Sequence, residues 1–137
     1  MKNTQNIGRM GENLAVQHLI NQKFDIIARN FYCKYGEIDI IAEKNNTIYF
    51  FEVKTRYENS INYPAESITY QKQQRLIKSA LTFLDGQPGF RRARPSKTAC
   101  TPVQTKSWRI SLIGILLQSR FASATPKAPE IEIIDIY

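Results

Sequence analysis

The chain has 137 residues, of which 42% are hydrophobic and 23% are charged, a composition typical of one globular domain with a buried core. Nineteen Lys and Arg residues against twelve Asp and Glu give a net charge of +7, which favours a polyanionic partner, with nucleic acid first. No apolar run approaches the roughly eighteen residues of a membrane span, and the N-terminus is too polar for a signal peptide, so we expect a cytoplasmic protein without membrane association.

Residues 7–22 have apolar positions at helical spacing and predict the first helix. Gly8, Gly11 and Ala15 form a strip of small residues along it, and close packing against another backbone would explain glycines inside a helix. Glu12 lies beside this strip. It is either an ordinary glutamate of the first turns, favoured by the helix dipole, or a carboxylate aimed at the hairpin described next.

Residues 24–31 predict a first strand, and the apolar runs 38–42 and 48–53 predict a β-hairpin. The turn is centred on Asn45-Asn46, because asparagine tolerates the positive φ that a tight turn requires. If the hairpin is symmetric about this pair, the opposed residues are Ile41 and Phe50, Asp39 and Glu52, and Glu37 and Lys54.

This register places two carboxylates, Asp39 and Glu52, directly opposite each other. The Cβ atoms of directly opposed strand residues lie roughly 4.5–5.5 Å apart, and like charges placed there repel. A cation between the two carboxylates would therefore stabilise the pair. Strand alternation puts Lys54 on the same face as Glu52. Two carboxylates and a lysine in open space are typical of a Mg²⁺ site that also takes a phosphate.

The alternative is that these residues form an ordinary solvated face. A shift of one residue in the turn would put Asp39 and Glu52 on opposite faces and remove the site. The apolar residues around them, at 40–41 and 49–51, favour a strand pair that is buried on both faces. Charges inside such a pair are costly unless they are paired or bound to metal.

The second helix is predicted at residues 65–84. Lys72, Arg75 and Lys78 fall three apart on its exposed side, where they either contact phosphates or are simply solvated. Residues 85–107 carry a net charge of +4 and no periodicity. This insertion is either a flexible basic arm for a nucleic-acid backbone or a disordered surface segment.

Residues 108–117 are apolar enough for a central strand, and residues 130–137 alternate as a strand at the margin of a sheet does. The predicted order is therefore α-β-β-β-α-β-β. We expect an α/β fold in which a mixed central β-sheet is flanked by helices, with all 137 residues in a single domain.

Four separated motifs, residues 8–15, 29–30, 36–42 and 51–56, resemble the YraN family, also called UPF0102. This bacterial family is regarded as one of endonucleases with the restriction-endonuclease-like fold, and it is similar to archaeal Holliday-junction resolvases. The resemblance covers residues 7–84 well and implies a metal-dependent endonuclease that hydrolyses phosphodiester bonds in DNA, including branched DNA. By analogy, it also makes a homodimer plausible.

The superfamily pattern is an aspartate followed by (Asp/Glu)-x-Lys on the next strand. By position, this implies that Asp39, Glu52 and the carbonyl of Val53 hold Mg²⁺ or Mn²⁺, that Glu12 completes the site, and that Lys54 acts on the attacking water or on the phosphate. The cations expected to bind nucleic acid are Arg9, Arg56, Lys72 and Arg75.

The chain departs from the family pattern near its C-terminus. A long insertion precedes Arg109-Ile110-Ser111, so that serine stands where the pattern has an acidic residue. A nucleic-acid-binding or scaffold protein that keeps the fold without turnover is therefore the rival hypothesis. A metabolic enzyme for a small phosphorylated substrate has little support, because no glycine-rich loop follows a strand.

Overall fold

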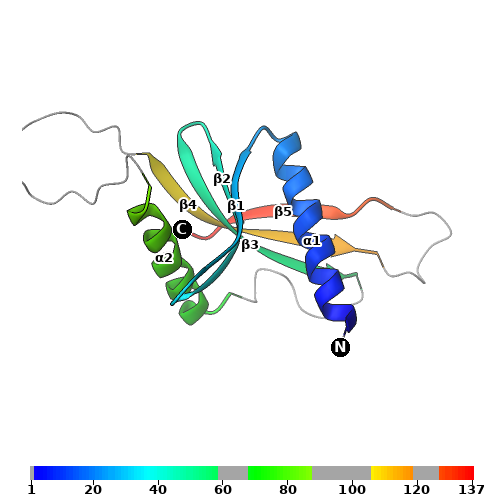
Figure 1. Cartoon of the computed structure of the whole chain (residues 1–137). Coiled ribbons are helices and arrows are strands. Elements are labelled where there is room, and N and C mark those ends of the chain that lie inside the picture. The colour runs from blue at the N-terminus through cyan, green and yellow to red at the C-terminus, as the bar shows by residue number, and fades with distance from the viewer. Residues whose placement is uncertain (1, 59–67, 88–105, 119–126) are drawn as a thin grey trace, which may run out of the picture.

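The computed structural model describes residues 2–58, 68–87, 106–118 and 127–137. Two helices and five strands follow one another in the predicted order (Figure 1). Their bounds are α1 Lys2–Asn21, β1 Asp25–Cys33, β2 Gly36–Lys44, β3 Thr47–Tyr57, α2 Tyr70–Asp85, β4 Ser107–Leu117 and β5 Glu130–Asp135. The predicted basic arm at 85–107 lies largely outside the described residues.

The strands form one sheet in chain order, β1-β2-β3-β4-β5. β1, β2 and β3 pair antiparallel, β3 and β4 pair parallel, and β4 and β5 pair antiparallel. A parallel pair requires a crossover connection, and α2 belongs to the connection between β3 and β4. The predicted mixed α/β sheet is confirmed, with β5 at its margin as expected.

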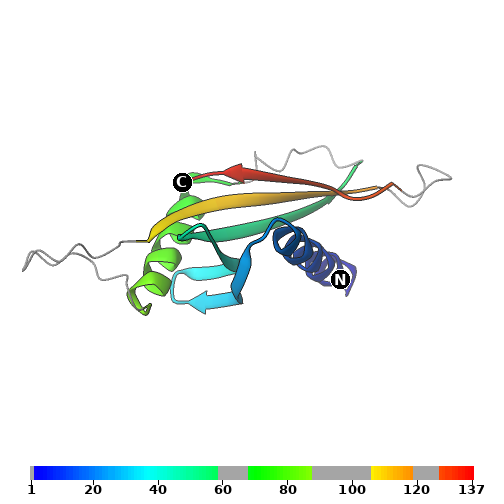
Figure 2. The same cartoon turned by 90° about the horizontal axis from the view of Figure 1, so that it is seen from above.

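Apolar side chains of β3 alternate between two cores. Phe50 belongs to the same core as Leu76 of α2, whereas Phe51 belongs to the same core as Leu19 of α1. Because successive strand residues point to opposite faces, the two helices cover opposite faces of the sheet. Figures 1 and 2 show them on either side of the β1–β2 pair.

α1 approaches β3 closely at Gly11. A β-carbon there would lie 1.7 Å from Oγ1 of Thr55, so a larger residue would force the helix or the strand to move. The close packing predicted for the small-residue strip therefore exists at Gly11, although a side chain rather than a backbone makes the contact. At Gly8 the same position is open space, so packing does not explain that glycine.

Both helices begin at residues other than those predicted. α1 starts at Lys2 rather than at residue 7, and α2 starts at Tyr70 rather than at residue 65. The start of α2 is set by Thr69, whose backbone is extended and whose Oγ1 accepts a hydrogen bond from the backbone N–H of Lys72 at 3.2 Å. Such a hydroxyl cap satisfies one of the free N–H groups of the first turn.

Candidate active site

The β2–β3 hairpin has the predicted register. Ile41 pairs with Phe50 and Ile40 with Phe51. Asn45 and Asn46 have φ values of 51° and 59°, the left-handed conformation that a tight two-residue hairpin turn requires. The two carboxyl-bearing residues, Asp39 and Glu52, are the next positions after the last paired residues.

The two strands separate at this point. The β2–β3 pairing ends at Ile40 and Phe51, whereas β3 continues to pair with β4 as far as Tyr57. The backbone N–H of Val53 consequently donates to Oδ2 of Asp39 at 2.7 Å rather than to a strand carbonyl. The separation therefore orients the Asp39 carboxylate as well as making room for it.

The predicted strand pairings of Asp39 with Glu52 and of Glu37 with Lys54 are wrong, because the β2–β3 ladder ends at Ile40 and Phe51. Glu37 pairs with Tyr32 of β1, on the other edge of β2. Its Oε1 accepts a hydrogen bond from Nδ2 of Asn30 at 3.1 Å. Alternation within a hairpin does not predict where its two strands separate, so the symmetric register could not predict the partner of Glu37.

Asp39 and Glu52 line one hollow of about 490 Å³, which we call the Asp39 hollow. α2 forms another wall of it with Lys72 and Arg75. The two carboxylates thus lie on the same side of the sheet, as the predicted site requires, and the alternative of opposite faces is excluded.

The electrostatics of the hollow disfavour two bare carboxylates. Burial, and then the charge of Glu52, raise the pKa of Asp39 from 3.8 to about 7, although the N–H of Val53 acts to lower it. Glu52 is itself only 6% exposed. Placing a cation here would favour the ionised form of Asp39.

Two lysines provide positive charge beside Glu52. Nζ of Lys54 lies 3.8 Å from Oε1 of Glu52, on the same face of β3 as predicted. Nζ of Lys72 contacts that same oxygen directly. The sequence pattern put Lys72 on the exposed side of α2, and it contained no signal that Glu52 lies opposite the first turn of this helix.

Glu12 does not line the Asp39 hollow. It lines a neighbouring hollow of about 830 Å³ with Arg9, Arg29 and Glu37, and Glu37 also lines the Asp39 hollow. Nδ2 of Asn30 donates to Oε2 of Glu12 at 3.2 Å and also to Glu37.

The two hollows are electrostatically connected, because the charge of Glu12 contributes to the raised pKa of Asp39. Asn30 and Glu37 are additional residues of this region that were not predicted as site residues. Both lie inside the motifs that carry the family resemblance, and this position is the signal in the sequence that could have identified them as site residues.

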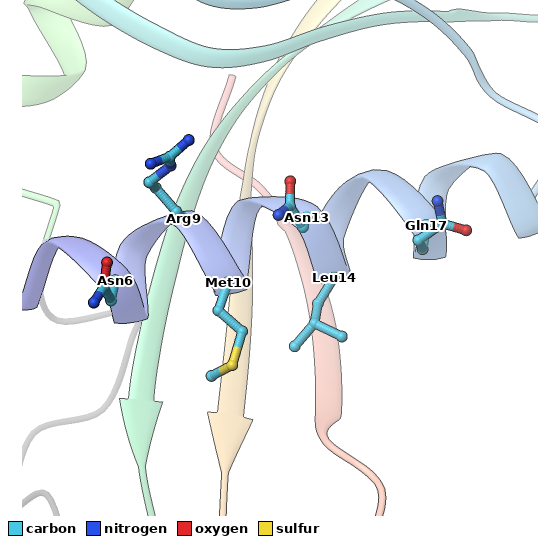
Figure 3. A pocket seen from close by; sticks show the side chains of 6 residues that line it. All are labelled: Asn6, Arg9, Met10, Asn13, Leu14 and Gln17. Carbon is cyan, nitrogen blue, oxygen red and sulfur yellow. The ribbon is translucent and has the colours of Figure 1, made fainter. Parts of the chain in front are cut away.

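The remaining predicted cations are in different environments. Arg75 is exposed on the wall of the Asp39 hollow. Arg9 and Met10 of α1 point in opposite directions (Figure 3). Both line a further hollow of about 480 Å³ along this helix, and no carboxylate is among the residues that line it. Nε of Arg56 is buried and has no hydrogen-bond partner among the described residues, so at least part of this side chain is withdrawn from the surface.

Ser111 stands where the family pattern has an acidic residue, and β5 brings one beside it. Oγ of Ser111 donates to Oδ1 of Asp135 at 2.6 Å, and Arg109 donates to Oδ2 of the same carboxylate at 3.2 Å. Asp135 thus supplies a carboxylate next to Ser111 from the neighbouring strand. It lines a different hollow with His18 and is not part of the Asp39 site.

The donors of the Asp39 hollow fit a hard divalent cation. Carboxylate oxygens are the ligands that Mg²⁺ prefers, and Mg²⁺ commonly uses only one or two carboxylates and keeps several waters. Across the described ranges, no three His, Cys, Asp or Glu side chains are grouped as a metal site. A cation held by Asp39 and Glu52 would complete its coordination with a backbone carbonyl, water or phosphate oxygens.

Comparison with known proteins identifies a family. A family model described as "Uncharacterised protein family UPF0102" matches residues 11–115. A UPF0102 protein of Caldicellulosiruptor bescii is 46% identical over 82 residues, which are 60% of this chain and 69% of the relative. One of Clostridium botulinum strain Hall is 46% identical over 80 residues, 58% of this chain and 65% of the relative. In the part of the chain that the structure describes, no helix is long and apolar enough to cross a membrane.

Proposed function

Since the chain belongs to the UPF0102 family, we propose that it is a metal-dependent endonuclease that hydrolyses phosphodiester bonds in DNA. The observation that carries this proposal is the pair of carboxylates, Asp39 and Glu52, which share one hollow beside a lysine. Burial and the charge of Glu52 raise the pKa of Asp39, and a bound cation would favour its ionised form.

Asp39, Glu52 and the carbonyl of Val53 would hold Mg²⁺ or Mn²⁺. When bound, such an ion supplies a more acidic water molecule and offsets the negative charge that develops on the phosphate. Asp39 is already oriented for this role, because its second oxygen is fixed by the N–H of Val53.

Lys54 supplies a second positive charge on the same face. Its Nζ lies 3.8 Å from Glu52, so it would donate a hydrogen bond to a phosphate oxygen or to the attacking water beside the carboxylates. Glu12 supports the site from the neighbouring hollow through Asn30 and Glu37, rather than as a direct ligand.

The DNA backbone would approach along α2. Arg75 and Lys72 line the hollow, and the start of a helix presents free N–H groups that favour a phosphate. Phosphate contacts of this kind give affinity without sequence preference. Branched DNA and a two-fold homodimer are the further parts of this proposal, which rest on the resemblance to junction resolvases.

A specific observation also favours the rival, a nucleic-acid-binding or scaffold protein without turnover. The direct contact of Lys72 with Glu52 already supplies a positive charge to one carboxylate of the pair. If that contact is permanent, the site keeps its structure and binds no metal.

The decisive experiment measures cleavage of plasmid, branched and single-stranded DNA with Mg²⁺ or Mn²⁺ and with EDTA. We expect metal-dependent cleavage by the wild type, and a loss of at least about 100-fold in Asp39→Ala and Lys54→Ala, because preorganised charges of this kind are commonly worth that much. Asp25→Ala and Lys127→Ala remove the same side-chain types at exposed positions and should cleave normally.

The outcomes separate the two candidates. Equal cleavage by wild type and both site variants would show that a contaminant or another site is responsible, and the mechanism would be refuted. DNA binding without cleavage under every metal condition would establish the rival.

A further inference from the structure

Glu52 is a buried carboxylate with two ammonium groups on one of its oxygens. Its side chain is 7% exposed, whereas those of Lys54 and Lys72 are both 35% exposed. Lys72 makes the direct contact and Lys54 lies farther away, at 3.8 Å. A charge this deeply buried requires a partner, and Lys72 is the partner in direct contact with it.

The position of Lys72 on its helix is unfavourable for the helix itself. It is the third residue after the cap, Thr69, and its backbone N–H donates to that cap. The first turn is the positive end of a helix, where acidic residues stabilise and lysine does not, and this turn of α2 contains no acidic residue. Its contact with Glu52, rather than helix stability, explains why a lysine stands there.

Resting on the function proposed above, we propose that Lys72 is an exchangeable counter-ion of the active site. Its Nζ binds Oε1 of Glu52, and the same carboxylate would hold a divalent cation, so lysine and cation would compete for one carboxylate. With Glu52 holding a cation, the ammonium group of Lys72 would be free within the hollow that its side chain lines and would donate to a substrate phosphate.

This exchange predicts opposite effects of one substitution. Removing the ammonium of Lys72 frees Glu52 and strengthens cation binding. The same change removes a phosphate donor and weakens DNA binding, but only when a cation is bound, because otherwise the lysine is held by Glu52. A side chain with a purely structural role would weaken both kinds of binding, or neither.

The test is a titration of the 137-residue chain with Mn²⁺ by calorimetry. We expect Lys72→Met and Lys72→Gln to bind Mn²⁺ about tenfold more tightly than wild type, the scale of one charged hydrogen bond. Lys72→Arg keeps the charge and should bind as the wild type does. Lys78→Met is the matched control, because Lys78 lies on the same helix over the ring of Tyr35 and has no contact with Glu52 among the described residues. Circular dichroism checks the folding of each variant.

The second measurement is the affinity for a fluorescently labelled single-stranded oligonucleotide by anisotropy, in saturating Ca²⁺ and in EDTA. In Ca²⁺, Lys72→Met should bind the oligonucleotide about three- to tenfold more weakly than wild type, and the salt dependence of its binding should fall by about one phosphate contact. In EDTA, the two proteins should bind the oligonucleotide equally. Unchanged or weaker Mn²⁺ binding by both Lys72→Met and Lys72→Gln would overturn the exchange while leaving the metal site intact. Mn²⁺ binding that is absent from the wild type, or unaffected by Asp39→Asn, would refute the metal site and the exchange together.

Discussion

Replacing Asp39 by asparagine should stabilise the protein at alkaline pH while removing the proposed metal site. The folded protein raises the pKa of Asp39 from 3.8 to about 7, through burial first and the charge of Glu52 second. Asparagine has nearly the same shape, carries no charge, and keeps an oxygen that can accept the N–H of Val53. The substitution therefore removes the unfavourable charge and little else.

The sign follows from where the proton binds. Between pH 3.8 and about 7 the folded protein holds a proton on Asp39 that the unfolded chain has lost, so this contribution to stability is fully present below pH 3.8 and is lost as the pH rises to 7. The rise of the Asp39 pKa from 3.8 to about 7 corresponds to about 4 kcal/mol of stability in full. Roughly 2 to 3 kcal/mol of this falls between pH 5 and pH 8.

The assay is urea unfolding in EDTA at pH 5 and at pH 8, for the wild type, Asp39→Asn and Asp25→Asn. The free energy of unfolding of Asp39→Asn, relative to the wild type, should rise by about 2 to 3 kcal/mol from pH 5 to pH 8. Asp25 is exposed at the start of β1, so Asp25→Asn should follow the wild type at both pH values.

Adding Mn²⁺ at pH 8 provides the functional half of the same experiment. A ligand that binds only the folded state stabilises it, so Mn²⁺ should raise the stability of the wild type and not that of Asp39→Asn. If Asp39→Asn and the wild type differ equally at both pH values, Asp39 ionises normally in the folded protein. The electrostatic reason for a cation between Asp39 and Glu52 would then be refuted.

Two further predictions concern the surroundings of the site. Gly11→Ala should lower the free energy of unfolding by about 1 to 3 kcal/mol, because the β-carbon of the alanine would overlap Oγ1 of Thr55. Urea unfolding should show a smaller loss of stability from Gly11→Ala in a protein that also carries Thr55→Ala. Equal losses in the two backgrounds would exclude this contact as the cause. Ser111→Asp restores the acidic residue of the family pattern but places it against Asp135, which Ser111 contacts at 2.6 Å. It should destabilise the protein by about 1 to 3 kcal/mol and more at pH 8 than at pH 4, and a loss that is independent of pH would refute the repulsion.

The hairpin could be predicted from the sequence because its information is local. Two asparagines that accept positive φ mark the turn, and alternation outward from them assigns each side chain to a face. The observed register and the common face of Glu52 and Lys54 follow from these few residues. The place of Asp39 beside Glu52 was predicted in the same way. That prediction assumed that the β2–β3 pairing continues past Ile40 and Phe51, where it in fact ends.

The end of that ladder could not be predicted, because it depends on a strand that comes much later in the chain. β3 keeps pairing with β4 after β2 has left it, and β4 begins only at Ser107. The approach of Lys72 to Glu52 is non-local in the same sense. Helical periodicity assigns a lysine to a side of its helix, but the residue opposite is set by how the helix packs on the sheet.

The separation of β2 from β3 links the fold to the proposed chemistry. Had the ladder continued, strand carbonyls would have satisfied the N–H groups there and the carboxylates would have been forced against each other. Because it stops, the N–H of Val53 is free to hold Asp39, and α2 can bring Lys72 to Glu52 in the space between. One irregularity in strand pairing thus provides the room, the orientation of one carboxylate and the access of a counter-ion to the other.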